Sequence, residues 1–279
     1  MRAGLRRTIG FALAAGALAL IVPSAAAQWG DFGWRWRAPR YRPAGQQDGT
    51  FSFCRLMFTS VRREPSGSGW TTDYPYADIN FSIRLSELTK TPVSLVHKDQ
   101  PNYWVVRLTD ETLFDCPFIM ASDIGTVGLS PEERDGLRTY LLKGGFLWVD
   151  DFWGVRAWEQ WARQIAQVLP PAEYPIIDVP ADHAIFKTLF QVSKVPQITN
   201  IGFWRSVGGK TTSERGAETA VPHLRMMTDS AGRIIVLMSH DTDIADAWER
   251  EGEDPGFFNQ FSPDGYAIGI NILLYAMTH

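Results

Sequence analysis

A helix signal and a strand signal follow each other directly in the segment LSPEERDGLRTYLLKGGFLWVDD, residues 129–151. Ser130, Pro131 and Glu133 form a capping box with proline in the first turn, which predicts a helix start. Gly144 is suited to the left-handed residue that ends such a helix. The apolar run FLWV follows at once, and short continuous apolar runs are typical of central parallel strands. This unit therefore favours an α/β fold.

The same alternation extends through most of the chain. Apolar, strand-like runs alternate with segments of helical spacing, which predicts an α/β sandwich with a mainly parallel sheet. We expect one folded domain over residues 50–279. The expected strands are 50–60, 92–97, 103–108, 117–122, 146–149, 173–180, 223–229 and 233–241. The expected helices are 78–88, 131–143, 155–168, 182–190 and 262–277.

The first 27 residues have the pattern of a secretory signal peptide. Three arginines precede the apolar stretch 9–22, and small residues follow before Gln28. This pattern predicts cleavage after Ala27 and a periplasmic or secreted protein. The alternative is an uncleaved N-terminal anchor, which would be the protein's contact with a membrane. The apolar stretch is short for a spanning helix. The pair Arg6-Arg7 leaves Tat export open, but the residues TIG after it match that signal poorly, which favours ordinary Sec secretion.

Residues 28–49 are rich in Arg, Trp, Pro and Gly and show no regular period. Such composition favours an extended arm or linker whose aromatic side chains pack on the domain surface. A cationic and aromatic contact site for a partner or a membrane surface is the alternative.

Charge and cysteine content restrict the class of protein. The 279-residue chain has a formal net charge of -4, which does not favour a nucleic-acid partner. Cys54 and Cys116 are its two cysteines. Export would permit a disulfide between them, but they also fit as small buried hydrophobic residues. Their sequence positions do not form a zinc-binding pattern.

Two carboxylates, Asp150 and Asp151, follow the apolar strand 146–149. In an open parallel sheet the carboxyl ends of the strands face the ligand crevice. Successive strand residues point to opposite faces, so we expect at most one aspartate to face this crevice unless the strand has already turned. The other would cap the helix beginning near Phe152, since aspartate is a favoured N-cap. A purely structural alternative has one aspartate as a cap and the other exposed.

A second acidic group follows the apolar run 234–238. It contains His240, Asp241, Asp243 and Asp246. If the two strands are parallel neighbours, this group meets Asp151 at one edge of the sheet. A divalent metal held by Asp151, His240, Asp241 and Asp243 would suit these side chains, as would a general base with an orienting carboxylate. The alternative is a solvated loop in which the aspartates form turns. No other cofactor is indicated.

Further candidate ligand-binding residues lie in two loops. Asp73, Tyr74 and Asp78 stand at a junction between a loop and a helix, where Asp78 would otherwise be a cap. Asp123 follows the apolar strand 117–122 and occupies the corresponding position at the end of that strand. With Asp150, Asp151, His240 and Asp241, these residues form the candidate site.

The chain resembles the domain family DUF4159. The resemblance covers about residues 50–279 and is carried most specifically by GGFLWVDDFWG and SHDTDIADAWE, with further likeness in LSPEERDGLRTYLLKGG, DHAIF and GINILLYAMT. It implies an exported or membrane-anchored bacterial protein. It also implies a three-layer, flavodoxin-like fold similar to class I glutamine amidotransferases and ThuA-like proteins.

That implied relation bears on activity. Amidotransferases carry a cysteine nucleophile on the turn after the strand that follows a glycine pair. The comparable turn of this chain carries Asp150, Asp151 and Phe152, so thioester chemistry is not expected. We therefore expect a noncatalytic binding or assembly module of the cell envelope. Its polar crevice would take a small polar molecule or an envelope protein. The alternative is a metal-assisted, hydrolase-like enzyme using Asp150 and Asp151 with His240, Asp241 and Asp243.

Overall fold

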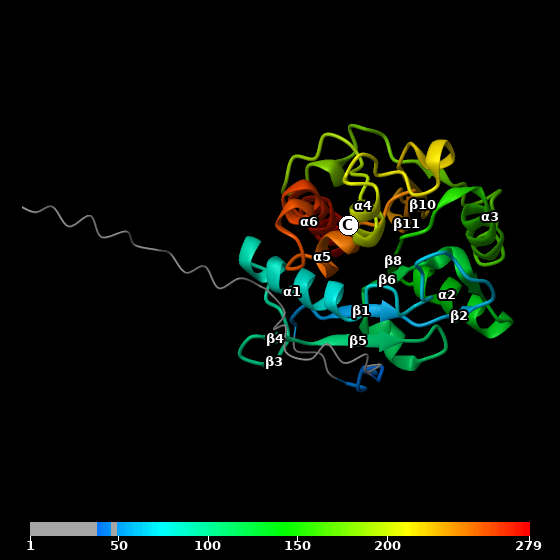
Figure 1. Ribbon diagram of the computed structural model, residues 1–279. Helices are drawn as coiled ribbons and strands as arrows, with labels where there is room; N and C mark the ends of the chain where they lie inside the picture. Colours follow the sequence, from blue (N-terminus) through cyan, green and yellow to red (C-terminus); the bar gives the residue numbers. More distant parts are fainter. Residues whose placement is uncertain (1–37, 46–48) are drawn as a thin grey trace, which may run out of the picture.

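A seven-stranded sheet organises the protein, as the computed structural model shows for residues 38–45 and 49–279 (Figure 1). Its strand order is β5-β1-β6-β8-β11-β10-β9. The strands β5, β1, β6, β8 and β11 are parallel, and β10 runs antiparallel to both of its neighbours. The prediction of an α/β fold with a mainly parallel sheet is confirmed. The strands are β1 (Phe53–Leu56), β5 (Tyr103–Val106), β6 (Phe118–Ser122), β8 (Phe146–Asp150), β9 (Ile177–Asp178), β10 (His223–Thr228) and β11 (Ile234–His240).

The strand order determines where a ligand crevice belongs. If the five parallel strands are renumbered 1 to 5 along the chain, their spatial order is 2-1-3-4-5. The chain moves outward from β1 to β5 and then returns to β6 on the other side of β1. In open parallel sheets, ligands bind beyond the carboxyl ends of the strands at such a reversal. The loops after β1, β6 and β8 therefore form the expected binding region.

Helices cover both faces of the sheet (Figure 1). One face packs against α1 (Tyr76–Leu88), α5 (Asp246–Glu249) and α6 (Pro255–Thr278), and the other against α2 (Pro131–Leu142) and α3 (Gly154–Ile165). Alternate strand residues supply the two cores: Trp148 faces α5 and α6, whereas Leu147 faces α2 and α3. The remaining elements are short: β2 (Thr59–Ser60), β3 (Leu95–His97), β4 (Gln100–Pro101), β7 (Val127–Gly128), α4 (Ile201–Ser206), η1 (Glu111–Asp115), η2 (Ile124–Thr126), η3 (Ala184–Phe186) and η4 (Gly216–Thr219).

Several predicted boundaries differ from those in the structure. The capping box at Ser130 is confirmed, because its hydroxyl accepts from the Glu133 N–H at 3.2 Å. The last helix begins at Pro255 instead of near Ser262. Asp254 accepts from the backbone N–H groups of the first turn, while Pro263 lies inside the helix. Of the helix predicted over 182–190, the structure forms the single turn η3.

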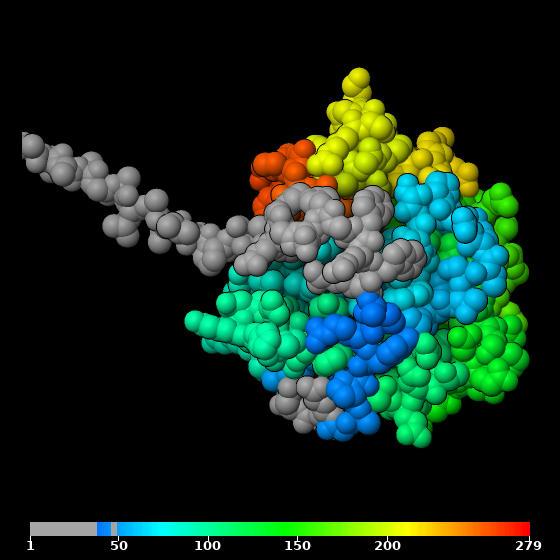
Figure 2. Space-filling model, turned by 60° about the horizontal axis from the view of Figure 1, so that its bottom comes forward, coloured from blue at the N-terminus to red at the C-terminus, as the bar shows by residue number. Residues whose placement is uncertain are grey.

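The described part of the arm lies against the edge of the sheet. The backbone carbonyl of Arg40 accepts a hydrogen bond from the Val105 N–H at 2.7 Å, and the Arg40 guanidinium lies over the Tyr103 ring. Arg40 and Tyr41 therefore lie beside the edge strand β5, and residues 38–45 are visible as the dark blue patch in Figure 2. Residues 28–37 and the predicted signal peptide lie outside the described residues.

Cys54 and Cys116 form a disulfide with Cα atoms 6.2 Å apart. None of the described helices has the length and hydrophobicity to cross a membrane.

Candidate functional site

Aspartates with left-handed backbone conformation follow three neighbouring strands. Asp123, Asp151 and Asp241 come directly after β6, β8 and β11, with φ of 53°, 52° and 61°. Asp73, in the loop between β2 and α1, has φ of 64°. Aspartate tolerates this conformation better than most residues because its short polar side chain can bond locally. Each strand thus ends in an abrupt change of direction, which redirects the aspartate side chain at the carboxyl edge of the sheet.

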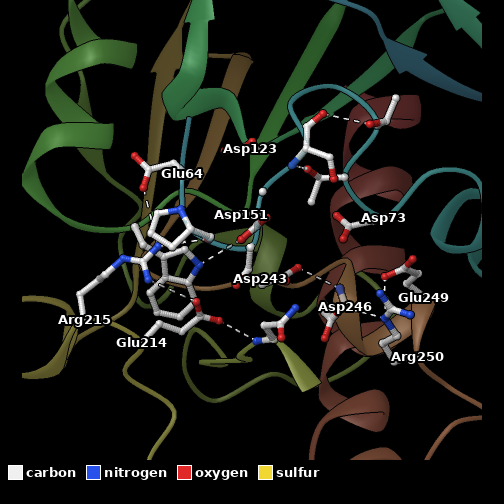
Figure 3. Close-up of a pocket in the computed structure, with 18 residues that line it drawn as sticks. Glu64, Asp73, Asp123, Asp151, Glu214, Arg215, Asp243, Asp246, Glu249 and Arg250 are labelled. Atoms are coloured by element: carbon white, nitrogen blue, oxygen red, sulfur yellow. Dashed lines mark hydrogen bonds and ion pairs between the residues drawn. The ribbon is translucent and has the colours of Figure 1, made fainter. Parts of the chain in front are cut away.

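A crevice of about 110 Å³ lies at this edge (Figure 3). Its wall combines loops that are distant in sequence. The segment near Pro65 meets the segment near Arg215, where the guanidinium donates to the Pro65 carbonyl at 3.4 Å. The charged residues that line the crevice are Glu64, Asp73, Asp123, Asp151, Glu214, Arg215, Asp243, Asp246, Glu249 and Arg250. They come from the loops after β2, β6, β8 and β11, from α5 and the residue that follows it, and from the loop before η4. Most therefore lie at the position that the strand order predicts.

A buried chain of hydrogen bonds holds Asp73 in place. Arg55 on β1 forms an ion pair with Asp78 of α1, and both side chains are fully buried. The same guanidinium donates to the Ser122 hydroxyl at 2.8 Å. Ser122 in turn donates to Asp73 Oδ2 at 2.6 Å. Arg55 therefore positions Asp73 through Ser122, from inside the core.

Three carboxylates converge in the centre of the crevice. Asp73, Asp151 and Asp243 each offer one oxygen, and these three oxygens lie within 4.8 Å of one another. The Trp153 indole N–H donates to Asp151 Oδ1 at 3.0 Å. Asp243 Oδ1 accepts from the backbone N–H of Asp246 at 2.9 Å. We call Asp73, Asp151 and Asp243 the central cluster. It brings together two of the predicted metal ligands with a residue that the sequence placed in the candidate site.

Arginines occupy the two ends of the crevice, and the central cluster lies between them (Figure 3). Arg250 Nε lies 2.8 Å from a carboxylate oxygen of Glu249 and 3.5 Å from one of Asp246. Together with Asp73, these two residues form a second group of three converging carboxylates. Arg215 lies 3.6 Å from Glu64 and 3.9 Å from Glu214. Both guanidinium groups thus have acidic partners of their own at the periphery.

The central cluster lacks comparable charge compensation. Burial raises the pKa of Asp243 well above its ordinary value, and Asp151 and Asp73 raise it further. Burial likewise raises the pKa of Asp151, and the charged groups with the largest further effects are Asp73 and Asp123. The pKa of Asp73 is also raised by burial, although Arg55 opposes this shift. Removing negative charges from water without a cation disfavours their ionised form.

Asp123 completes the acidic wall. It is 1% exposed, and burial raises its pKa to about 7. Asp123 Oδ2 accepts from the Gly69 N–H at 2.8 Å. Its Oδ1 is buried and has no hydrogen-bond partner among the described residues. Buried carboxylate oxygens are normally hydrogen-bonded or bound to a cation, so this oxygen has an unused capacity to bind a ligand.

Other predicted site residues have structural partners. Asp150 is fully buried and accepts from the Ser239 hydroxyl and from the Ala245 N–H, the latter at 2.9 Å. Asp150 therefore holds the loop after β11 and does not line the crevice. Asp78 pairs with Arg55. Tyr74 packs on Trp70 and Tyr103, outside the crevice lining.

His240 and Asp241 lie on the α3 side of the sheet edge. The His240 ring packs between Phe152 and Trp158, and its Nε2 lies 3.2 Å from the Gly154 carbonyl oxygen. Asp241 Oδ1 accepts from the Gly154 N–H at 2.8 Å, so Asp241 binds the first turn of α3. The interpretation that Asp150 or Asp151 caps this helix is wrong. The chain turns sharply at Asp151, which leaves the helix start facing Asp241 from the neighbouring strand.

The sequence profile of a family described as "Domain of unknown function (DUF4159)" matches residues 57–277. The chain belongs to the DUF4159 family. A comparison with curated proteins finds no match. The DUF4159 match contains every residue that lines the crevice.

Sequence reasoning missed several crevice residues of this DUF4159 domain. The segment 246–250, DAWER, contains Asp246, Glu249 and Arg250 at spacings of three and four. If this segment is helical, those spacings predict that the three side chains share one helix face. Asp246 belongs to the acidic group after the run 234–238, but the sequence pattern does not distinguish it as a site residue. Glu64, Glu214 and Arg215 lie in irregular loops and carry no periodic signal.

We expect the metal-free DUF4159 domain to lose stability as the pH rises from 5 to 8. Asp123, Asp150 and Asp246 have folded-state pKa values of about 7, compared with an ordinary value of 3.8. Between these values the folded state binds more protons than the unfolded state, so the free energy of unfolding falls with rising pH. A single group with this shift gives a decrease of about 3 kcal/mol between pH 5 and 8. Calorimetry of chelator-treated protein measures it.

The matched comparison for this pH effect is Asp243→Asn against Asp178→Asn. The first substitution removes a titrating member of the central cluster and should flatten the pH dependence. Asp178 has a 75% exposed side chain at the edge of the sheet, and its substitution should leave the dependence unchanged. A wild-type stability that is constant or increases from pH 5 to 8 would contradict this explanation.

Proposed function

We propose that this protein is an exported, noncatalytic binding module whose crevice takes a positively charged ligand. One observation carries the proposal. Among the described residues, eight carboxylates and two guanidinium groups line the crevice, and both guanidinium groups are paired at its ends. The excess of negative charge is therefore concentrated at Asp73, Asp151 and Asp243. A cation would relieve their mutual repulsion.

The turn after β8 supports a noncatalytic role. We infer a relation to the class I glutamine amidotransferase-like fold, because a left-handed residue stands between a central strand and a helix, as in a nucleophile elbow. Here that residue is Asp151, with φ of 52°. An aspartate that faces other carboxylates is suited to binding a cation, whereas acyl transfer through a thioester requires a cysteine.

The N-terminal sequence supports an envelope location. Its arginines, apolar stretch and small residues fit a signal for export. In our proposal the module operates in the periplasm or outside the cell, either free or held by an uncleaved N-terminal segment. Its ligand is a small polar molecule or ion, or a cationic group of an envelope protein.

The hydrolase alternative requires His240 to act together with Asp151 and Asp243. His240 instead packs beside α3, with its ring nitrogens near Gly154, Asp241 and Arg225. Asp150 is engaged by Ser239 and Ala245. The group Asp150, Asp151, His240, Asp241 and Asp243 is thus divided between separate environments, which disfavours a shared catalytic role.

Thermal unfolding in the presence of charged probes tests the binding proposal. The cations are Ca²⁺, Mg²⁺, ethylenediammonium and spermidine, and the anions are phosphate and sulfate, at constant ionic strength and pH 7.5. A cation present at 100 times its dissociation constant should stabilise the protein by about 2.7 kcal/mol, which corresponds to a melting-temperature increase of roughly 5–10 °C. Stabilisation by an anion alone, or by none of the probes, would refute the proposal.

A further inference from the structure

We propose that the central cluster, with Asp123 beside it, is a binding site for a divalent, oxygen-preferring cation, with Ca²⁺ favoured. This inference rests on the proposed function and specifies its ligand. Asp73, Asp151 and Asp243 supply three oxygens within 4.8 Å of one another. Carboxylate oxygens bound to one Ca²⁺ at 2.3–2.6 Å would lie at about this mutual separation or closer.

Two groups of three acidic residues in this crevice share Asp73, but they differ in their compensation. The group of Asp73, Asp246 and Glu249 faces Arg250, whose Nε lies 2.8 Å from Glu249. Among the described residues, no ion pair joins Asp151 or Asp243 to a basic side chain. The protein thus supplies its own cation to one group. The central cluster is the group for which a bound cation would supply the missing charge.

Asp123 provides an independent indication of a ligand. Its carboxylate is 1% exposed, lines the same crevice, and retains a buried Oδ1 without a hydrogen-bond partner in the described part of the chain. Asp123 also acts electrostatically on Asp151. A buried oxygen of this kind costs free energy unless a cation or a donor satisfies it. A hydrated cation held by the central cluster would provide that partner through one of its waters.

The ligand chemistry determines which cation is favoured. All the converging groups are carboxylates, and hard cations prefer such oxygens, whereas Zn²⁺ is bound mainly through nitrogen and sulfur. Mg²⁺ usually keeps several waters and uses one or two protein carboxylates. Three carboxylates in an irregular arrangement suit the larger coordination number and flexible geometry of Ca²⁺.

Isothermal titration calorimetry of the chelator-treated protein tests the site. We expect one Ca²⁺ per chain, with Mg²⁺ binding more weakly. Asp151→Asn and Asp243→Asn should each weaken Ca²⁺ binding at least tenfold. The matched control is Asp241→Asn, which changes the same residue type with the same left-handed backbone at the same sheet edge, but outside the cluster. Its Ca²⁺ affinity should remain within threefold of wild type.

Terbium luminescence gives a second readout that does not depend on the folding of the aspartate variants. Trp153 donates to Asp151 at 3.0 Å, so it lies close enough to sensitise a Tb³⁺ ion in the central cluster. Trp153→Phe should reduce the sensitised emission several-fold, and added Ca²⁺ should displace Tb³⁺ from the wild-type protein. The control is Trp204→Phe, because the Trp204 indole donates to Gln260 instead of to a residue of the central cluster. This substitution should leave the emission unchanged.

The outcomes separate this inference from the proposed function. Binding of ethylenediammonium or spermidine without binding of any divalent ion would overturn the metal site and leave the proposal of a cation-binding crevice intact. Failure of both classes of cation would overturn both. Ca²⁺ binding that survives Asp151→Asn and Asp243→Asn, or Tb³⁺ emission that is unaffected by Trp153→Phe, would place the ion elsewhere and also overturn the inference.

Discussion

Replacement of Arg55 by methionine is expected to lower the free energy of unfolding by about 3–5 kcal/mol. Arg55 and Asp78 are both fully buried, and the substitution leaves the Asp78 carboxylate in the core without its counter-ion. The change also removes the donor to Ser122, which orients Asp73 in the crevice. We therefore expect weaker Ca²⁺ binding in the folded variant as well. Urea denaturation and calcium titration measure the two effects.

Two comparison variants isolate the cause of the Arg55 effect. The double variant Arg55→Met, Asp78→Leu removes both charges and should recover most of the lost stability, since an apolar replacement of a buried pair is often near neutral. Arg205→Met interrupts contacts of a 46% exposed arginine with Glu253 and should cost less than 1 kcal/mol. A loss below 1 kcal/mol for Arg55→Met would contradict the structural role of the buried pair.

Removal of the disulfide is expected to have an effect of similar size. Cys54 and Cys116 close a loop with a sequence separation of 62. Loop-closure entropy predicts a loss of about 4 kcal/mol for the double variant Cys54→Ala, Cys116→Ala. The melting temperature should fall by about 10 °C. Calorimetry of the variant and of the oxidised wild type measures the difference.

Reduced wild-type protein is the control for the disulfide variant. Both cysteines are at most 1% exposed, so a reductant reaches the disulfide only in partly unfolded protein. The control is therefore prepared by reducing unfolded protein and refolding it in the presence of reductant. The reduced protein should melt close to the alanine variant. If the alanine variant instead matches the oxidised wild type within about 1 °C, the bridge does not stabilise the fold. The cysteines would then act as small buried hydrophobic residues, the alternative consistent with their sequence context.

The architecture was predictable because its signals are local. The capping box at Ser130 and the apolar runs of β6, β8 and β11 identify elements from neighbouring residues alone. The start of α6 was not predictable from a local rule. Asp254-Pro255 and Ser262-Pro263 both have the pattern of a helix start, and the structure continues one helix through the second. Pro263 itself is exposed, and burial of its helix neighbours Phe261 and Ser262 outweighs its poor helix propensity.

The site was predictable in position but not in composition. Strand-end reasoning located Asp123 and Asp151 correctly in the crevice, since both follow central parallel strands. It did not separate Asp243, which enters the crevice, from Asp241, which binds the first turn of α3. That distinction depends on how the loop after β11 turns. Likewise, no local pattern pairs Arg55 with Asp78, because their contact forms only when α1 packs on the sheet.

A crystal structure of the protein grown with Mn²⁺ tests the central claim most directly. Mn²⁺ shares the preference of Ca²⁺ for oxygen ligands and scatters X-rays anomalously. We predict one strong anomalous peak bounded by carboxylate oxygens of Asp73, Asp151 and Asp243, with Asp123 Oδ1 reaching the ion or one of its waters. A well-ordered crevice without such a peak, with the three carboxylates bonded to solvent or to one another, would contradict the account.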